Sequence, residues 1–221
     1  MRAALGESAA AGPFFRLAGG AAGPSWQQPD RFYRDALAGL LADTAVRLGT
    51  AERRVAASIM HLGYAARLWS PVLGCALLRQ IVPDLGALRI AATPQLRLGL
   101  AQLSGWHQAD PHGQAALIYD TVVGAHLEPL ARAMPVKIAA GLLRGNAASA
   151  MAGALGELAR YRPPLRAPAR ELAALLLATG TLRGAGQLTG PGLGFVRASC
   201  CLYYRVPGGG ICSDCPLGRP G

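Results

Sequence analysis

The stretch that decides the fold is TAERRVAASIMHLGYAARLWSPVLGCALLRQI, residues 50–81. Its apolar residues recur at three- and four-residue steps, the spacing of one helix face, at Val55, Ile59, Leu62 and Leu68. Pro71 lacks the amide hydrogen of an interior helical residue, so we expect it to kink or split the helix. The continuation from Val72 to Ile81 is expected to stop at Pro83.

The same helical spacing recurs on both sides of this run. It predicts helices over residues 37–48, over residues 114–134, from Pro135 through Leu158, and from Ala169 to Ala178. The interior of the helix predicted from Pro135 through Leu158 contains many small residues, including Gly141, Gly145, Ser149 and Gly153. Small side chains let another helix or a ligand approach the backbone closely.

Two segments depart from the helical pattern. Residues 85–106 alternate apolar with polar or small residues around Thr93-Pro94-Gln95, which predicts a short hairpin. Residues 180–194 are rich in glycine, and we expect an irregular covering loop there. The predicted fold is therefore mainly α (α+β), a helical domain with a short β-hairpin in the middle and an irregular, cysteine-rich C-terminal tail.

The domain organisation follows from the same pass along the chain. Residues 1–29 are rich in Ala, Gly and Pro and show no sustained period, so we expect a flexible N-terminal arm. Residues 30–195 contain no convincing linker and are expected to form one mostly helical domain. Residues 196–221 are expected to be a C-terminal segment packed on it.

Composition excludes several classes of protein. With 52% of its 221 residues apolar, the chain is not expected to be disordered. No run reaches the roughly 18 apolar residues of a bilayer span, so no transmembrane segment is expected. Glu7, Gly12 and Pro13 interrupt any secretion signal. We therefore expect a cytoplasmic protein and leave a loose membrane association open.

The formal net charge of +10 attracts anions in general, including phosphate, carboxylate ligands, acidic proteins and nucleic acids. The arginines are scattered, however, and the longest run is Arg53-Arg54. No basic stripe with interleaved aromatic residues is visible, so a nucleic-acid partner is not expected.

Four of the five cysteines crowd into the tail at the spacing C-C-x10-C-x2-C, as Cys200, Cys201, Cys212 and Cys215. Such clusters form disulfides or bind a metal, and disulfides are disfavoured without a secretion signal. Structural zinc usually takes two C-x2–4-C pairs, and only the second pair here complies. Adjacent side chains of a strand point to opposite faces, so the first pair needs a bent backbone to reach one small centre. A wider [2Fe–2S] cluster is favoured modestly, and zinc remains open.

The residues around the cysteines suit a buried anionic centre. We expect Arg197 and Arg205 to offset its negative charge. We expect the backbone amides of Gly208–Gly210 to donate hydrogen bonds to the sulfurs. Tyr203 and Tyr204 either shield the centre from water or pack the tail on the helices. Cys75 lies in an apolar helical run and is expected to be a core residue. The histidines, His61, His107, His112 and His126, share no ligand spacing.

The segment from Ser199 to Leu217, with its SCCLYYR and CSDCPL ends, resembles the C-terminal signature of the FhuF-like ferric-siderophore reductases. That signature carries a [2Fe–2S] cluster. The resemblance implies that the cofactor ligands are Cys200, Cys201, Cys212 and Cys215, with no catalytic residue beyond the cluster. Two weaker similarities are Leu68-Trp69-Ser70-Pro71 and Gly145-Asn146. An aromatic residue often precedes that Gly-Asn pair, whereas this chain has Arg144, so the role of Asn146 stays open.

The resemblance implies an enzyme that transfers one electron to siderophore-bound ferric iron and releases ferrous iron in the cytosol. The segments around Gly184-Ala-Gly186 and 190–194 follow no predicted strand and open no long helix, so they fail the dinucleotide fingerprint. We therefore expect a protein electron donor such as a ferredoxin, docked through Arg197 and Arg205. The alternative is a non-catalytic [2Fe–2S] or zinc module that serves as electron carrier, sensor or structural site.

Overall fold

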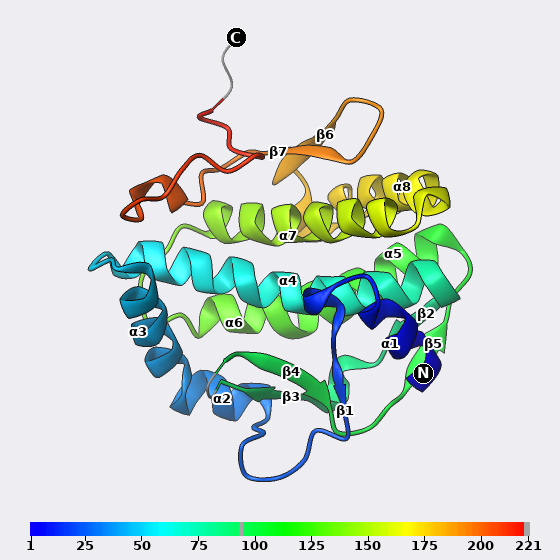
Figure 1. Ribbon diagram of the computed structural model, residues 1–221, viewed down its shortest axis with the longest axis horizontal. Coiled ribbons are helices and arrows are strands. Elements are labelled where there is room, and N and C mark those ends of the chain that lie inside the picture. The colour runs from blue at the N-terminus through cyan, green and yellow to red at the C-terminus, as the bar shows by residue number, and fades with distance from the viewer. Residues whose placement is uncertain (93–94, 219–221) are drawn as a thin grey trace.

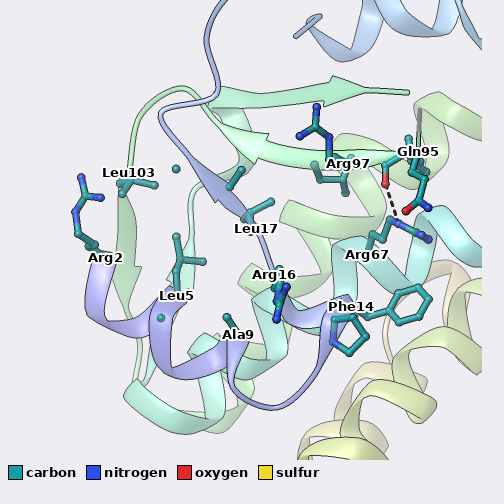
Figure 2. Close-up of a pocket in the computed structure, with 16 residues that line it drawn as sticks. Arg2, Leu5, Ala9, Phe14, Arg16, Leu17, Arg67, Gln95, Arg97 and Leu103 are labelled. Carbon is teal, nitrogen blue, oxygen red and sulfur yellow. Dashed lines mark hydrogen bonds between the residues drawn. The ribbon is translucent and has the colours of Figure 1, made fainter. Parts of the chain in front are cut away.

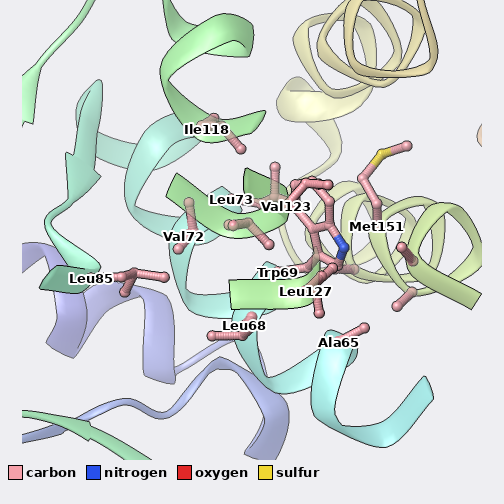
Figure 3. Packing of buried hydrophobic residues seen from close by; sticks show 14 of the residues in the cluster. Ala65, Leu68, Trp69, Val72, Leu73, Leu85, Ile118, Val123, Leu127 and Met151 are labelled. Atoms are coloured by element: carbon pink, nitrogen blue, oxygen red, sulfur yellow. The ribbon is translucent and has the colours of Figure 1, made fainter. Parts of the chain in front are cut away.

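The computed structural model describes residues 1–92 and 95–218. Two long helices, α4 (Arg53–Arg79) and α7 (Ala140–Tyr161), pack side by side at its centre (Figure 1). Most of α4 is buried, because apolar side chains cover it nearly all round. Figure 3 shows the fully buried Trp69 of α4 packed near Met151 of α7. The mainly helical class predicted from the sequence is confirmed.

The other helices surround this central pair. α2 (Pro29–Asp35) leads into α3 (Leu37–Leu48), which packs on α4 and ends at Gly49 in a left-handed conformation. The predicted helix over residues 114–134 is confirmed as three joined pieces: α5 (Pro111–Tyr119), the π-helical segment η3 (Asp120–Leu127) and α6 (Glu128–Arg132). α8 (Arg166–Leu177) confirms the helix predicted from Ala169, and it lies on α7.

The strands form small sheets at the edges of the helical body. β3 (Leu88–Ala91) pairs antiparallel with β4 (Arg97–Leu100), which confirms the hairpin, although Thr93-Pro94 lies outside the described residues. β1 (Ala18–Gly19) adds to β4 in parallel. β2 (Ile81–Pro83) pairs with β5 (Gly105–His107).

The structure corrects expectations at three prolines: Pro71 does not split its helix, Pro83 does not end it, and Pro135 does not begin the next one. α4 runs through Pro71 without a break, and it ends at Arg79 because the chain turns into strand β2. Pro71 is itself buried, and α7, α3 and α1 pack around the helix, so tertiary packing outweighs the missing hydrogen bond. Pro135 does not open the next helix, since residue Ala139 is still extended and α7 begins at Ala140.

The loop expected over residues 180–194 contains a hairpin instead. β6 (Gly186–Thr189) pairs antiparallel with β7 (Gly194–Arg197), which leads into the cysteine tail. Gly190 in the connection adopts φ +65°, a left-handed conformation that glycine reaches without a steric penalty. The glycines therefore mark a tight connection rather than irregular structure.

The first residues also differ from the flexible arm that their composition suggested. α1 (Arg2–Ala9) packs on α4, and a 3₁₀ turn over Pro13–Phe15 follows it. Ala4, Leu5 and Phe15 are buried in the core, so a few apolar side chains anchor a segment without any sustained period. In the part of the chain that the structure describes, no helix is both long and apolar enough to cross a bilayer.

Candidate metal centre

The cysteine tail lies across the N-terminal parts of the two central helices (Figure 1). The hydroxyl of Ser199 donates a hydrogen bond to the carbonyl of Gly141 in α7, at 2.9 Å. The hydroxyl of Ser58 in α4 donates to the carbonyl of Cys201, at 2.6 Å. These contacts attach the first cysteine pair directly to the helical body.

The four tail cysteines lie close to one another. The sulfurs of Cys201 and Cys212 lie 3.2 Å apart, and Cys215 is a close neighbour of Cys200. None of them forms a disulfide. Cys201 and Cys215 are buried, while the other two are partly exposed. Among the described residues, no three His, Cys, Asp or Glu side chains are arranged around a single metal ion.

The backbone bends at Leu202, directly after the adjacent cysteines. Leu202 adopts φ +66°, a left-handed conformation that is unfavourable for a residue with a branched side chain. Its amide donates a hydrogen bond to the sulfur of Cys200 at 3.3 Å. The turn that follows the Cys200-Cys201 pair therefore supplies a donor to one sulfur.

The thiols crowd one another electrostatically. Burial raises the pKa of Cys200, and the charges of Cys201 and Cys215 add to that rise while the Leu202 amide opposes it. Burial and the neighbouring Cys201 thiol raise the pKa of Cys212 to about 12. Four thiolates are thus unfavourable here without a cationic centre, whereas a metal stabilises them because it binds the deprotonated form. The donor set fits a thiolate-bound metal group.

A buried polar network connects the cysteines to both helices. Arg197, fully buried at the end of β7, donates through Nη2 to the side-chain oxygen of Asn146 in α7. The Asn146 amide donates to the carbonyl of Ser58 at 2.9 Å and to its hydroxyl at 3.1 Å. Since Ser58 holds Cys201, the network runs from Arg197 to the cysteine backbone. No pattern in the sequence pointed to Ser58, and only a weak similarity pointed to Asn146.

Arg197 is a buried cation that lacks full pairing. Its Nε and Nη1 atoms have no hydrogen-bond partner among the described residues, and Oδ2 of Asp214 is 3.9 Å from Nε. Asp214 lies between Cys212 and Cys215 in the chain. The position fits the expected role of offsetting negative charge. It does not fit docking of a carrier protein, because no part of this side chain reaches the surface.

Arg205 is at the surface but is already paired. Its guanidinium binds Glu52 just before α4, with an N–O distance of 2.9 Å. The structure therefore gives Arg205 a tethering contact for the tail, and its charge is partly neutralised by Glu52.

Other residues expected around the centre are placed differently. The amide of Gly209 donates to the carbonyl of Val206 at 2.7 Å, so this glycine closes a turn instead of binding a sulfur. Tyr203 and Tyr204 lie in a 3₁₀ turn and are 38% and 50% exposed. Their turn contacts α4, so both side chains lie on the helical body and stay partly open to solvent.

The remaining candidates belong to the core or the surface. Cys75 is fully buried in α4, as expected of a core residue, and burial raises its pKa to about 12. Burial, aided by the charge of Arg197, lowers the pKa of His61 to about 4. Burial likewise lowers the pKa of His126 to about 4, while His107 is exposed. A fully buried histidine beside Arg197 was not foreseen.

Comparison with known proteins bears on the tail alone. Residues 197–217 match the family model described as the FhuF 2Fe-2S C-terminal domain. The matched segment begins at Arg197 and contains all four clustered cysteines. No curated protein and no solved structure matches the chain. The tail is thus similar to an iron–sulfur domain, which agrees with the resemblance seen in the sequence.

Proposed function

We propose that Cys200, Cys201, Cys212 and Cys215 hold a [2Fe–2S] cluster and that the protein reduces siderophore-bound ferric iron in the cytosol. The observation that carries the proposal is the convergence of these thiols in a segment similar to an iron–sulfur domain. The adjacent Cys200-Cys201 pair departs from the two C-x2–4-C pairs usual for structural zinc, which favours the cluster over a single ion.

When bound, the cluster supplies a site that accepts one electron from a reduced donor protein and passes it to ferric iron. The chain contributes electrostatics to this site. The amide of Leu202 points at Cys200, and the buried cation of Arg197 lies in the same network. Hydrogen bonds and positive charge stabilise the more negative, reduced state, so both groups are expected to raise the reduction potential.

The tail anchors contribute rigidity. Ser58 and Ser199 tie the segment that contains Cys200 and Cys201 to α4 and α7. Burial of Cys201 and Cys215 keeps water away from one side of the centre, while the partial exposure of Cys200 and Cys212 leaves another side open. An exposed side suits a site that must approach both an electron donor and a chelate.

The electron count of the reaction is simple. A one-electron donor protein of the ferredoxin class is oxidised once for each ferric ion reduced to ferrous iron. Siderophores hold ferric iron through hard oxygen donors, and the lower charge of ferrous iron weakens those bonds. Iron is therefore released while the organic ligand stays intact.

Analysis of freshly purified protein tests the cluster. We expect a red-brown protein with about two irons and two acid-labile sulfides per chain. A Cys212→Ser variant should lose both, whereas Cys75→Ala, which removes the core cysteine, should keep them. A colourless protein with one zinc would contradict the proposal and support the structural module.

Stopped-flow mixing tests the activity. Chemically reduced protein is mixed with ferric chelates, and a chromogenic ferrous chelator reports the product. One ferrous ion should form for each electron stored. A protein that holds the cluster but reduces none of the chelates would be an electron carrier or a sensor.

A further inference from the structure

A basic cavity of about 650 Å³ lies between α1, the Pro13–Phe15 turn, β1 and β4 (Figure 2). Four arginines line it: Arg2, Arg16, Arg67 and Arg97. Apolar side chains such as Leu5 and Leu17 complete its wall. Its volume and mixed lining are those of sites that bind small organic molecules.

The positive charge of this arginine cavity is uncompensated. None of the described residues that line it is acidic. Glu7 is the acidic residue of α1, and it is held by Arg79 and Arg162, which lower its pKa. Four cations around one cavity repel one another, and a bound anion would relieve that repulsion.

Arg67 is held in place although it has no carboxylate partner. It projects from α4, is half-buried, and donates to the carbonyls of Leu96 at 3.1 Å and Gly63 at 2.8 Å. Its guanidinium lies over the ring of Phe14, 4.8 Å from the ring centre (Figure 2). A guanidinium has five N–H donors, so some remain for a ligand.

Arg97 is similarly supported, 5.3 Å from the ring centre of Trp26. Two of the four cations are therefore positioned before any ligand binds. Such preorganisation reduces the entropy lost on binding, which favours specific recognition over loose attraction.

A second cavity adjoins this region and extends to the cysteine tail, and its charged lining residues are Glu157 and Arg160. It has a volume of about 550 Å³, shares Pro13 and Phe14 with the arginine cavity, and is also lined by Ser213. Ser213 directly follows Cys212 in the chain. Across this second cavity, a Cβ atom added at Gly153 of α7 would meet nothing within 4 Å, so there is open space.

We propose that the two adjoining cavities bind the ferric chelate and that the arginine cavity selects chelates of net negative charge. The anionic groups lie against Arg16, Arg67 and Arg97, and the metal lies toward Ser213, because electron transfer weakens steeply with distance. This inference rests on the proposed function, and it specifies the substrate as a ferric complex of net negative charge.

Gallium(III) chelates test the binding step without reduction, since gallium shares the charge of ferric iron and is not reduced under these conditions. A tris-catecholate gallium complex carries −3, and a tris-hydroxamate complex is neutral. Calorimetry on the cluster-loaded protein should show at least tenfold tighter binding of the anionic complex. Equal affinity for the two complexes would overturn the proposal.

Charge reversals locate the site. Arg16→Glu and Arg97→Glu should each weaken binding of the anionic complex about tenfold, the loss expected when one charge-assisted contact is removed. Arg54→Glu makes the same change in net charge at an exposed position outside both cavities. If Arg54→Glu weakened binding as much as the two cavity variants do, the anionic complex would be attracted only by the net charge of the protein. The proposed site would then be wrong.

A steric variant separates the second cavity from the first. Gly153→Leu should weaken binding of both gallium complexes, while Gly39→Leu, at another open helical position, should not. If binding depends on these residues but the protein reduces no ferric complex, the proposed site is supported and the proposed reaction is wrong. Ferric reduction with unchanged KM in all variants would retain the reaction and reject the site.

Discussion

The helical body and the cysteine tail are held by different forces. The body is organised around α4 and α7, whose interface is filled by apolar side chains such as Trp69 and Met151. After β7, the tail as far as residue 218 contains one 3₁₀ turn, and polar contacts through Ser58, Ser199 and Arg205 hold it on the helices. Burial of apolar area stabilises the body without any ligand, whereas the tail brings together thiols that favour a metal group.

This difference implies two separable stabilities. Hydrophobic burial contributes about 25 cal/mol per Å² of apolar surface, which is ample for an interface of long helices. A polar contact adds only about 0.5–1.5 kcal/mol net, so the tail depends on a few groups acting together. Variants in the body should therefore change global unfolding, and variants under the tail should change retention of the metal group first.

The largest effect is expected from the centre of the body. Trp69→Ala should lower the free energy of unfolding by about 3–5 kcal/mol, because it leaves a large cavity between fully packed helices. Denaturant unfolding followed by circular dichroism measures this loss. Trp106→Ala, at an exposed position in β5, is the matched control and should have a much smaller effect.

Acid should weaken the body through its buried histidines. His61 has a pKa of about 4 in the folded state, below its usual 6.5, so the unfolded chain binds more protons between these values. Stability is therefore complete above pH 6.5 and falls as the pH drops toward 4, by on the order of 3 kcal/mol for this group.

Unfolding curves from pH 7 to pH 4 check this expectation. A His61→Gln variant should lose less stability over that window than the unchanged protein, and His107→Gln, at an exposed site, should behave like the unchanged protein. Identical pH dependence in all three proteins would show that His61 is not held neutral by burial.

The network beneath the tail should show an intermediate effect. Asn146→Ala removes the acceptor for Arg197 and the donors to Ser58, so it should cost about 1–3 kcal/mol. Iron should be lost to a chelator faster than from the unchanged protein. Ser149→Ala in the same helix leaves this network intact and should retain iron normally.

The smallest effect is expected at the surface contact of the tail. Arg205→Ala breaks an exposed ion pair with Glu52, so stability should change by less than about 1 kcal/mol. The rate of electron uptake from a ferredoxin-type donor gives the sharper measurement. If Arg205 contributes to docking, the variant should take up electrons more slowly than the unchanged protein, and most clearly at low salt. If the two proteins have the same rate at every salt concentration, Arg205 is not part of the docking site.

The helices and the cysteine group could be predicted because their signals are local. Apolar spacing located α3, α5 and α8, and the Cys200-Cys201 pair with Cys212 and Cys215 identified the candidate centre. The failures involved packing. The effect of Pro71 was predicted from its missing amide hydrogen, and the flexibility of the N-terminal segment from its lack of a period. In both cases, contacts with helices distant in the sequence determined the structure instead.

The sequence alone determined that helices dominate the fold and that four thiols crowd the tail, since periodicity and spacing are properties of neighbouring residues. Only the tertiary structure decided that Ser58, Asn146 and Arg197 meet beneath the cysteines. It also gathered Arg2, Arg16, Arg67 and Arg97 around one cavity. The physical reason is that these residues are far apart in the chain, and the packing of α4 against α7, α1 and the small sheets brings them together.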